Sequence, residues 1–319
     1  MTVDGRPVLV STETEDPTAD LVIAELNRRR VPVLRFDPGR DFPTRATLAA
    51  AITAGGWSGS LTVGERSADL SRVRALYHRR PNPYTPESDH QADRFAAQEN
   101  RRGLGGVLGA LPGCLYLSHP QAIARAEYKP AQLSVASRLG LSVPATLVTN
   151  SPAEAKLFAA AQPTIYKPLH AGAYDVDGEP VGIWAAPVEP GEITGAVTNC
   201  AHLFQAQVPK SGDVRAVVVG DQVFCALITA PPGVVDWRSE YRNLTYEPVD
   251  CPGPVRAALL RFLGDFSLRF GAFDFAVTAE GEWWFLECNP NGQWAWLEHE
   301  AGLPIASAIA DLLENGVSE

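Results

Sequence analysis

The segment from Gly271 to Trp296 constrains the fold of this chain more than any other stretch. It reads GAFDFAVTAEGEWWFLECNPNGQWAW. Apolar and aromatic residues alternate with polar ones on both sides of Glu280-Gly281, which indicates two antiparallel strands joined by a short turn. We predict these strands over 272–278 and 283–289, and the aromatic flanks favour a buried hairpin. Along the second strand, one face is expected to carry Trp283, Phe285, Glu287 and Asn289.

Two acidic residues of this hairpin are expected to face each other. A two-residue turn at Glu280-Gly281 places Asp274 opposite Glu287, with Cβ atoms about 4.5–5.5 Å apart. Carboxylates at that separation repel each other and favour a cation between them. Oxygen ligands suit a hard ion such as Mg²⁺, and Asn289 adds a third oxygen. The pattern therefore predicts a metal site formed by Asp274, Glu287 and Asn289, with a solvated surface acid pair as the alternative.

Composition excludes several classes of protein. Of the 319 residues, 45% are hydrophobic and 20% are charged, which is the composition of a folded globular chain. The formal net charge is −10. An acidic chain is a poor general binder of nucleic acid, because phosphate contacts need Lys and Arg. We therefore expect no nucleic-acid partner, and any bound anion must meet a local basic site.

The cysteines and the apolar segments indicate the compartment. The five Cys residues show no Cys-x-x-Cys spacing, which argues against a disulfide scaffold and a structural zinc site. The first residues, MTVDGRPVLV, lack the basic and apolar regions of a signal peptide. No apolar run reaches the length of about 18 residues that a membrane helix requires. We therefore expect a soluble, cytoplasmic protein without a membrane partner.

The chain is expected to form three units. Residues 1–120 begin with strand, helix and strand, a βαβ pattern without Gly-x-Gly-x-x-Gly. Residues 121–200 form a small α/β unit that begins with a helix over 121–139. Residues 201–319 contain strands at 203–208, 213–219 and 222–229, a helix at 254–270 that ends at Gly271, and the hairpin.

Several basic residues invite either a functional or an ordinary explanation. Arg215 lies on an apolar strand, where its burial is costly unless it meets an anion or an acid. Lys129 and Lys167 are two of the four Lys residues, and each could also be an ordinary helix or strand lysine. The pair Arg79-Arg80 could bind an acidic peptide or could simply be solvated.

The hairpin motif resembles a known metal site. An acidic strand residue followed by Glu-x-Asn on the next strand is similar to the metal site of ATP-grasp carboxylate–amine ligases. The stretch LFQAQVPK at 203–210 and Asp213-Val214-Arg215 resemble the adenine hinge and the phosphate-contacting strand of that fold. The resemblance implies an α/β (α+β) ATP-grasp fold with an N-terminal βαβ pre-ATP-grasp domain, a small central α/β domain and a C-terminal antiparallel-sheet ATP-binding domain.

Within this class the chain resembles the ribosomal peptide maturases that make graspetides, the microviridin-type synthetases. The similarity covers nearly the whole chain and rests on the sequences VLVSTETEDPTADLVIAELNRRRVPVLRFD, YHRRPNPY, EYKPAQLSVASRLGLSVPATLVTN, Asp236-Trp237-Arg238 and NPNGQW. It implies phosphorylation of Asp or Glu side chains of a precursor peptide, made of a leader and a core. The acyl phosphates then react with Ser or Thr hydroxyls, or with Lys amines, to close macrocycles. It also implies a homo-oligomer.

The resemblance assigns a role to each site residue. Lys129 and Lys167 would contact the ATP phosphates, and the hinge contacts would come from Gln205, Gln207 and Val208. Two Mg²⁺ ions would be held, one by Asp274 and Glu287 and the other by Glu287 and Asn289. Arg215, and also Arg238, would stabilise the transferring phosphoryl group and the acyl phosphate.

Two departures from the family pattern stand out. The segment Pro168–Tyr174 contains few glycines for a phosphate loop, and Ala206 occupies the place where the hinge often has Glu. Two other functions stay open: an ATP-grasp ligase that joins an amino acid to a small molecule or a protein tail, and a non-catalytic module that binds nucleotide or peptide. The complete set of metal ligands argues against the non-catalytic module.

Overall fold

The computed structural model describes residues 5–170 and 174–316. Its first unit is a parallel sheet with the strand order β2-β1-β6-β7. The strands are β1 (Val8–Ser11), β2 (Val33–Phe36), β6 (Ala75–His78) and β7 (Leu115–Tyr116). The short helices α2 (Pro38–Asp41) and η1 (Leu70–Arg72) lie in its connections. The predicted βαβ start is therefore confirmed.

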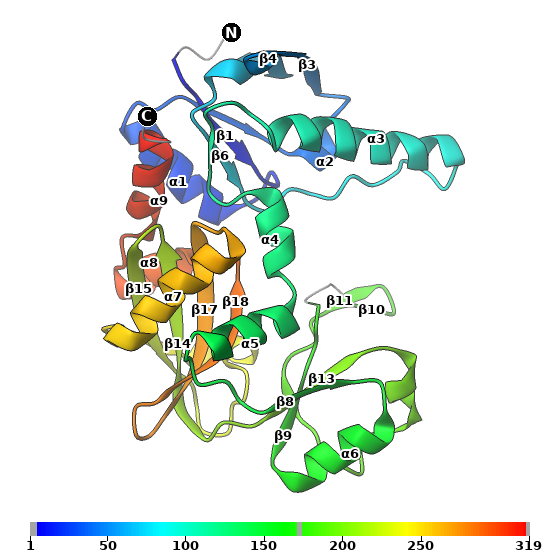
Figure 1. Ribbon diagram of the computed structural model, residues 1–319, viewed down its shortest axis with the longest axis vertical. Coiled ribbons are helices and arrows are strands. Elements are labelled where there is room, and N and C mark those ends of the chain that lie inside the picture. The colour runs from blue at the N-terminus through cyan, green and yellow to red at the C-terminus, as the bar shows by residue number, and fades with distance from the viewer. Residues whose placement is uncertain (1–4, 171–173, 317–319) are drawn as a thin grey trace.

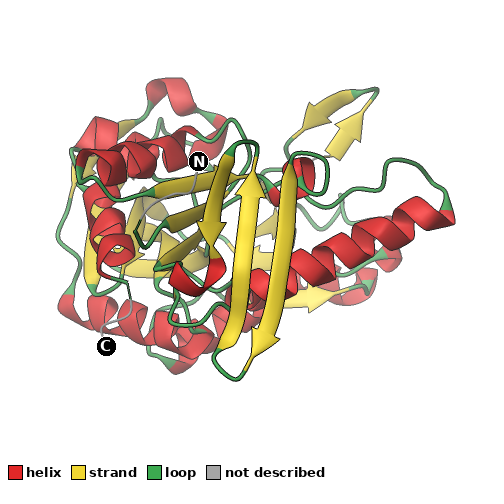
Figure 2. Ribbon diagram, turned by 90° about the horizontal axis from the view of Figure 1, so that it is seen from above, coloured by secondary structure: helices red, strands yellow, loops and turns green. Residues whose placement is uncertain are grey.

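Two different layers cover the two faces of this sheet. Val8 and Val10 pack in one cluster with α1 (Pro17–Arg28) and α9 (Ile305–Asn315). Leu9 points the other way and packs with α3 (Gln91–Leu108). That second layer also contains an antiparallel sheet of β3 (Ala46–Thr53), β4 (Gly56–Val63) and β5 (Arg66–Asp69). This sheet lies above α3 in Figure 1 and in front of it in Figure 2. Strict alternation of strand side chains thus builds a three-layer domain.

The central unit is a four-stranded sheet of order β12-β9-β13-β8. Its strands are β8 (Thr146–Thr149), β9 (Thr164–Lys167), β12 (Ala186–Pro187) and β13 (His202–Ala206). Helix α6 (Pro152–Ala161) and the turn η2 (Gly195–Asn199) cover one face, with Ser151 capping α6 through its side chain. A separate hairpin of β10 (Tyr174–Val176) and β11 (Glu179–Val181) follows β9. Residues 171–173, which belong to the glycine-poor segment Pro168–Tyr174, lie outside the described residues.

The third unit is a five-stranded antiparallel sheet of order β16-β15-β14-β17-β18 (Figure 1). Its strands are β14 (Lys210–Val219), β15 (Gln222–Thr229), β16 (Thr245–Pro248), β17 (Phe270–Thr278) and β18 (Trp283–Asn289). One face packs against α4 (Pro120–Ala126), α5 (Lys129–Arg138) and α7 (Gly253–Phe266). The remaining short elements are η3 (Trp237–Ser239), η4 (Tyr241–Asn243) and α8 (Ala295–Ala301).

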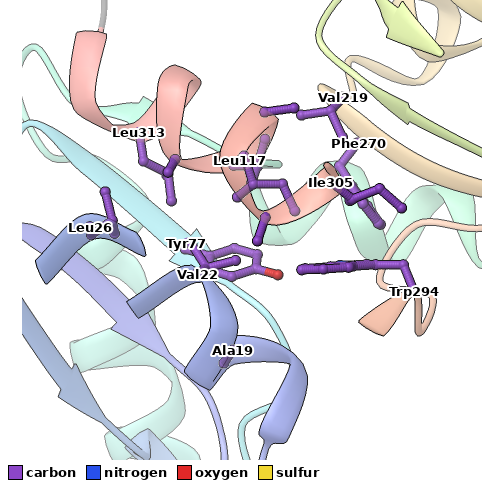
Figure 3. Close-up of a cluster of buried hydrophobic side chains, with 14 of the residues drawn as sticks. Ala19, Val22, Leu26, Tyr77, Leu117, Val219, Phe270, Trp294, Ile305 and Leu313 are labelled. Carbon is purple, nitrogen blue, oxygen red and sulfur yellow. The ribbon is translucent and has the colours of Figure 1, made fainter. Parts of the chain in front are cut away.

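The opposite face of this sheet changes character along its length. At one end Val219 and Phe270 meet Trp294 and helices α1 and α9 in an apolar cluster that joins the first and third units (Figure 3). Further along the same face stand Arg215 and Asp274, which are buried polar residues. The apolar half therefore anchors the sheet and the polar half is free to form a site.

The spatial units do not coincide with the predicted sequence blocks. Strand β13 follows residue 200 but pairs with β8 and β9 of the central sheet. Helices α4 and α5, which begin at Pro120 and Lys129, pack on the third sheet although the prediction assigned residues 121–200 to the central unit. On sheet membership we propose to place the last boundary between β13 and β14 rather than at 200/201.

Two predicted helices differ from the structure. Helix α7 ends at Phe266, because Ser267 adopts the left-handed conformation with φ 58° and its N–H bonds the last carbonyls. Phe270 therefore belongs to β17, and Gly271 does not stop the helix. The single helix expected over 121–139 is two helices, and the second begins at Lys129 with Pro130 in its first turn.

The predicted pairing of Asp274 with Glu287 occurs, but the loop and the strand register that produce it differ from the prediction. Asp274 does lie opposite Glu287, but Thr278 N donates to Glu282 O at 3.0 Å, which closes a three-residue loop over 279–281 with Gly281 at φ +83°. That loop alone would pair Asp274 with Leu286, and a bulge at this point restores the pairing with Glu287. The bulge also separates the faces: Phe285 packs in the core beneath the sheet, so the prediction that it shares a face with Glu287 was wrong.

Within the described residues, no helix has both the length and the apolar character needed to cross a membrane.

Candidate functional site

Three neighbouring strands place one charged residue each at the same level of the sheet. Arg215 on β14 lies opposite Asp274 on β17, which lies opposite Glu287 on β18. All three are at most 6% exposed. Nη1 of Arg215 donates to both carboxylate oxygens of Asp274 at 2.8 Å. Nδ2 of Asn289 donates to Oδ2 of Asp274 at 3.3 Å.

Two further cations reach Glu287 from other elements. Nζ of Lys129, in the first turn of α5, is 2.7 Å from Oε2. Nη1 of Arg238, in η3, is 3.3 Å from Oε1. Asp236 holds Arg238 in place by accepting from its Nε and Nη2 at 2.8 Å each. Asp236 is thus part of the site, and only its position beside Arg238 in the Asp-Trp-Arg motif marks it in the sequence.

Lys167 approaches from the central sheet. It ends β9, is 6% exposed, and its Nζ is 3.5 Å from Oε1 of Gln205 on the neighbouring strand β13. Nε2 of Gln205 donates to Thr146 at 2.9 Å. Gln205 is itself only 1% exposed. The side chain of Gln205 therefore contacts Lys167. The residues that follow it, 206–210, line a separate cavity.

The protonation of the central carboxylates is set by these neighbours. Burial opposes charge on Glu287, but Lys129, Lys167 and Arg238 outweigh it and hold the pKa of Glu287 well below its usual range. Burial raises the pKa of Asp274, and Arg215 counteracts this. Burial lowers the pKa of Lys167, with the charge of Glu287 opposing that shift. Glu287 is therefore an anion that holds several cations around one point.

Two cavities adjoin this cluster. The smaller, of about 210 Å³, lies between the hinge and the third sheet and is lined by residues 206–210 and 233–235 with Ala276 and Leu286. Gln207 and Val208 line it, whereas Gln205 does not. The larger, of about 640 Å³, contains Lys129, Arg215, Arg238 and Asn289, and it extends to residues 78–81 of the first unit.

Two polar residues near the cluster escaped the sequence analysis. Gln132, one turn after Lys129, donates to Cys288 O at 2.7 Å and accepts from Cys288 N at 2.8 Å, which ties α5 to the strand that carries Glu287. Lys210 bonds Asp213 at 2.6 Å and Val235 O at 2.7 Å beside the smaller cavity. The spacing of Gln132 from Lys129 was the available signal.

The ligand set has the composition of a nucleotide-bound metal site. No group of three or more His, Cys, Asp or Glu side chains suited to a metal occurs in the described part of the chain. Asp274 and Glu287 supply two carboxylates, and Asn289 adds an amide. Mg²⁺ is commonly held by one or two carboxylates together with substrate phosphates, rather than by a cage made only of protein groups. The residues present therefore fit such an ion when phosphates complete its shell.

The fold and this cluster define the chain as an ATP-grasp protein. The first unit agrees with this, since residues 7–124 match the model of the MvdD pre-ATP grasp domain. No curated protein matches the sequence.

Solved structures of similar length narrow the class to a family. Macrocyclase MdnC from Microcystis aeruginosa MRC, bound with precursor peptide MdnA, is 30% identical, with a TM-score of 0.83 over 97% of this chain and 99% of that chain. A RiPP-associated ATP-grasp ligase from Chryseobacterium gregarium, in complex with ADP and a leader and core peptide, is 26% identical, with a TM-score of 0.88 over 98% of each chain. Macrocyclase MdnB from the same Microcystis strain is 28% identical, with a TM-score of 0.81 over 98% and 100%. This chain belongs to the ATP-grasp ribosomal peptide maturases, the graspetide or microviridin-type synthetase family.

Proposed function

We propose that this chain is an ATP-dependent ligase that closes macrocycles in a ribosomal precursor peptide. It would phosphorylate Asp or Glu side chains of the peptide and join them to Ser or Thr hydroxyls or to Lys amines. The observation that carries the proposal is the convergence of Lys129, Arg215 and Arg238 on the carboxylates Asp274 and Glu287. In a chain of net charge −10, this gathering of cations suits a phosphate-rich substrate.

ATP is the proposed phosphoryl donor. Its adenine would occupy the smaller cavity, against Gln207 and Val208, and its phosphates would meet Lys129 and Lys167. For Gln205 we propose the orientation of Lys167 in place of an adenine contact. The ADP in the Chryseobacterium ligase supports a nucleotide as the ligand.

Two Mg²⁺ ions are proposed to accompany the nucleotide. Asp274 and Glu287 would hold one, and Glu287 and Asn289 the other. Bound there, they would neutralise charge on the phosphates during transfer. Glu287 is suited to this role because the surrounding cations keep it ionised.

The reaction has two steps that balance without a further reagent. First, an oxygen of the peptide carboxylate attacks the γ-phosphorus of ATP, the bond from that phosphorus to the β–γ bridging oxygen breaks, and ADP leaves. Second, the peptide hydroxyl or amine attacks the acyl carbon, and the bond from carbon to the phosphate-bearing oxygen breaks. Phosphate leaves and the proton of the nucleophile passes to phosphate or solvent, so the peptide loses one water.

Arg215 and Arg238 are the proposed catalytic residues. Both line the larger cavity, and their guanidinium groups would stabilise the negative oxygens of the transferring phosphoryl group and of the acyl phosphate. Asp236 keeps Arg238 pointed toward Glu287. Because Arg presents fixed paired donors, neither residue should be replaceable by Lys without loss of rate.

The proposed partner is a precursor peptide with a leader and a core. The larger cavity, of about 640 Å³, has room for an extended core segment, and Arg80 and His78 continue its polar wall into the first unit. The peptides bound to MdnC and to the Chryseobacterium ligase support this partner class.

Release of phosphate tests the proposal. We expect ATP consumption to depend on the short peptide encoded beside the gene, and a scrambled peptide of equal charge should be inactive. Stimulation by free amino acids and not by the peptide would contradict the proposal and indicate a ligase of small substrates. Nucleotide binding without turnover on any substrate would indicate a binding module instead.

We also propose a homo-oligomer that uses the outer face of the first unit. Among the described strands β3 pairs only with β4, so its outer edge is unpaired. Ile52 on β3 is 67% exposed and Phe95 on α3 is 66% exposed. Helix α3 carries Asp93 near its start and Arg101 two turns later, so two antiparallel copies would pair unlike charges. An apolar edge strand of this kind is a liability unless another chain covers it.

A further inference from the structure

Arg79 is a buried cation that the proposed chemistry does not use. It follows β6 in the first unit, is 2% exposed, and is among the largest fully buried side chains. It is therefore neither a solvated residue nor free to bind a peptide. A buried guanidinium is costly unless its donors are satisfied. The groups that its charge and its terminal nitrogens meet lie on two different units of the fold, whereas its Nε has no hydrogen-bond partner among the described residues.

On its own unit Arg79 meets Asp16. Nε of Arg79 is 3.3 Å from Oδ2 of Asp16, and both side chains are 1% exposed. Asp16 is fixed independently, since it caps α1 by accepting from the N–H groups of Thr18 and Ala19. Its Oδ2 also accepts from Thr12 at 2.7 Å. Asp16 is thus a rigid support for the guanidinium.

On the third unit Arg79 holds the segment that follows Asn289. Its Nη1 donates to Asn291 O at 2.7 Å and to Gly292 O at 3.3 Å, and its Nη2 donates to Oε1 of Gln293. Thr18 donates to the same Oε1 of Gln293 at 2.5 Å. The first unit therefore fixes three consecutive residues of this segment.

The held segment is in direct contact with Arg215. Nη2 of Arg215 donates to Gln293 O at 2.9 Å, while Nη1 bonds Asp274. Gly292 packs so closely that a Cβ there would lie 2.7 Å from Nη2 of Arg215. The orientation of Arg215 is therefore set on one side by Asp274 and on the other by a carbonyl that Arg79 keeps in place.

We propose that Arg79 is a positioning residue that acts through the segment 291–293 on Arg215. This inference rests on the proposed function, because it assumes that Arg215 contacts the reacting phosphate. In this proposal the first unit contributes to the reaction, because its Arg79 holds the segment that orients the guanidinium of Arg215. The substitution Arg79→Lys would keep the positive charge beside Asp16. A lysine has no planar guanidinium, so it could not donate at the same time to the backbone oxygens of Asn291 and Gly292 and to Oε1 of Gln293.

The kinetic test is a double-variant comparison. We expect Arg79→Lys to lower kcat at least about tenfold and to change KM for ATP by less than about threefold, as for an interaction made in the transition state. Arg215→Lys should lower kcat further. The double variant should be no slower than Arg215→Lys within about twofold, because the two residues act as one unit. Multiplicative losses, or a change confined to KM, would overturn the proposal.

Arg74→Lys is the matched control. Arg74 also joins the first unit to a distant segment, donating from Nη1 to Glu314 O at 2.6 Å, but its acceptor is on α9 and not in the segment 291–293. We expect a loss of thermal stability with unchanged kcat. If Arg79→Lys fails to fold, Asp16→Asn replaces it, since Asn caps a helix as well as Asp. That variant should also lower kcat and show no added effect on Arg215→Lys, and an additive effect would overturn the proposal.

A second readout does not depend on any substrate. In protein labelled with ¹⁵N-arginine, the guanidinium signal of Arg215, assigned by its loss in Arg215→Lys, should shift or broaden in Arg79→Lys and stay unchanged in Arg74→Lys. An unchanged Arg215 signal in Arg79→Lys would refute the positioning role whatever the reaction. Failure of wild-type protein to modify a peptide, with the signal shifted as expected, would instead refute the proposed function and leave the positioning intact.

Discussion

At the scale of the residue, several charged side chains of the cluster each bond more than one partner. Glu287 accepts from Lys129 and Arg238, which come from a helix and a loop far apart in the sequence. Arg215 likewise serves Asp274 and a backbone carbonyl. Four charged groups of the cluster each have more than one partner, so a substitution at one position changes the electrostatics of several; they are Glu287, Asp274, Arg215 and Arg238.

Glu287→Gln should abolish turnover while the protein stays folded. Gln preserves the size of the side chain, but it removes the one anion that both Lys129 and Arg238 contact and a proposed ligand of both metals. We expect kcat to fall at least about a hundredfold, the scale seen when a preorganised charge is lost. Glu280→Gln, in the exposed turn of the same hairpin, is the control and should keep full activity. Retained turnover in Glu287→Gln would refute the metal assignment.

His78 should make stability depend on pH. Burial, and less strongly the charge of His119, lowers the pKa of His78 to about 4 from an ordinary value of 6.5. Between pH 6.5 and pH 4 the unfolded chain therefore binds a proton at His78 that the folded chain does not bind. The contribution of His78 to the free energy of unfolding is fully present above pH 6.5 and is lost as the pH falls toward 4. We expect His78→Asn to remove about 2 kcal/mol of the loss between pH 7 and pH 5, measured by urea unfolding. Equal losses in both proteins would contradict this.

At the scale of the element, strand pairing does most of the positioning. Register on β14, β17 and β18 aligns Arg215, Asp274 and Glu287, and the central sheet brings Lys167 to the cluster by a separate set of strands. The smaller cavity lies between the hinge after β13 and the third sheet. Its shape should therefore control nucleotide affinity with little effect on the chemistry.

Val234→Trp should weaken nucleotide binding selectively. Val234 lines the smaller cavity from a loop, so a larger ring there can fill space without disturbing the sheet. We expect the Kd for ATP to rise at least about tenfold, since each 1.4 kcal/mol of lost contact is a factor of ten. Leu157→Trp on exposed α6 is the control. An unchanged Kd, measured by calorimetry, would place adenine elsewhere.

The hairpin shows how far sequence reasoning reaches. The pattern around Glu280-Gly281 predicts the two strands, because alternation is a local signal, whereas the pairing of Asp274 with Glu287 was derived from a two-residue turn that the structure does not have. The bulge before Glu287 was not predicted, and it is this bulge that places Glu287 opposite Asp274. The contacts of Arg79 with Asn291 and of Asp236 with Ala185, whose N–H donates to Oδ2 of Asp236 at 3.3 Å, were missed because they connect segments that only the tertiary fold brings together.

At the scale of the whole molecule, the first and third units share a core. The apolar cluster of α1, α9 and Trp294 fixes their relative position, and this is what allows Arg79 to reach the site (Figure 3). The strand β3 escaped prediction because ATLAAAIT has no clear alternation of apolar and polar residues. Its unpaired edge is the surface that we propose for assembly.

The oligomer should depend on the face formed by β3 and α3. We expect the wild-type protein to run above its monomer mass in light scattering coupled to size exclusion. Ile52→Lys should shift it toward the monomer, because a charge on an edge strand blocks pairing. Leu157→Lys, an equally exposed leucine on α6, should leave the mass unchanged. A monomeric wild type would contradict the proposal.

The central claim is tested most directly by the mass of the peptide. The enzyme is mixed with ATP, Mg²⁺ and the short peptide encoded beside its gene, and the intact product is weighed. We predict the loss of one water for each ring, only when ATP is present, with mild base separating esters from amides. An unchanged peptide mass, while free amino acids stimulate phosphate release, would contradict the claim.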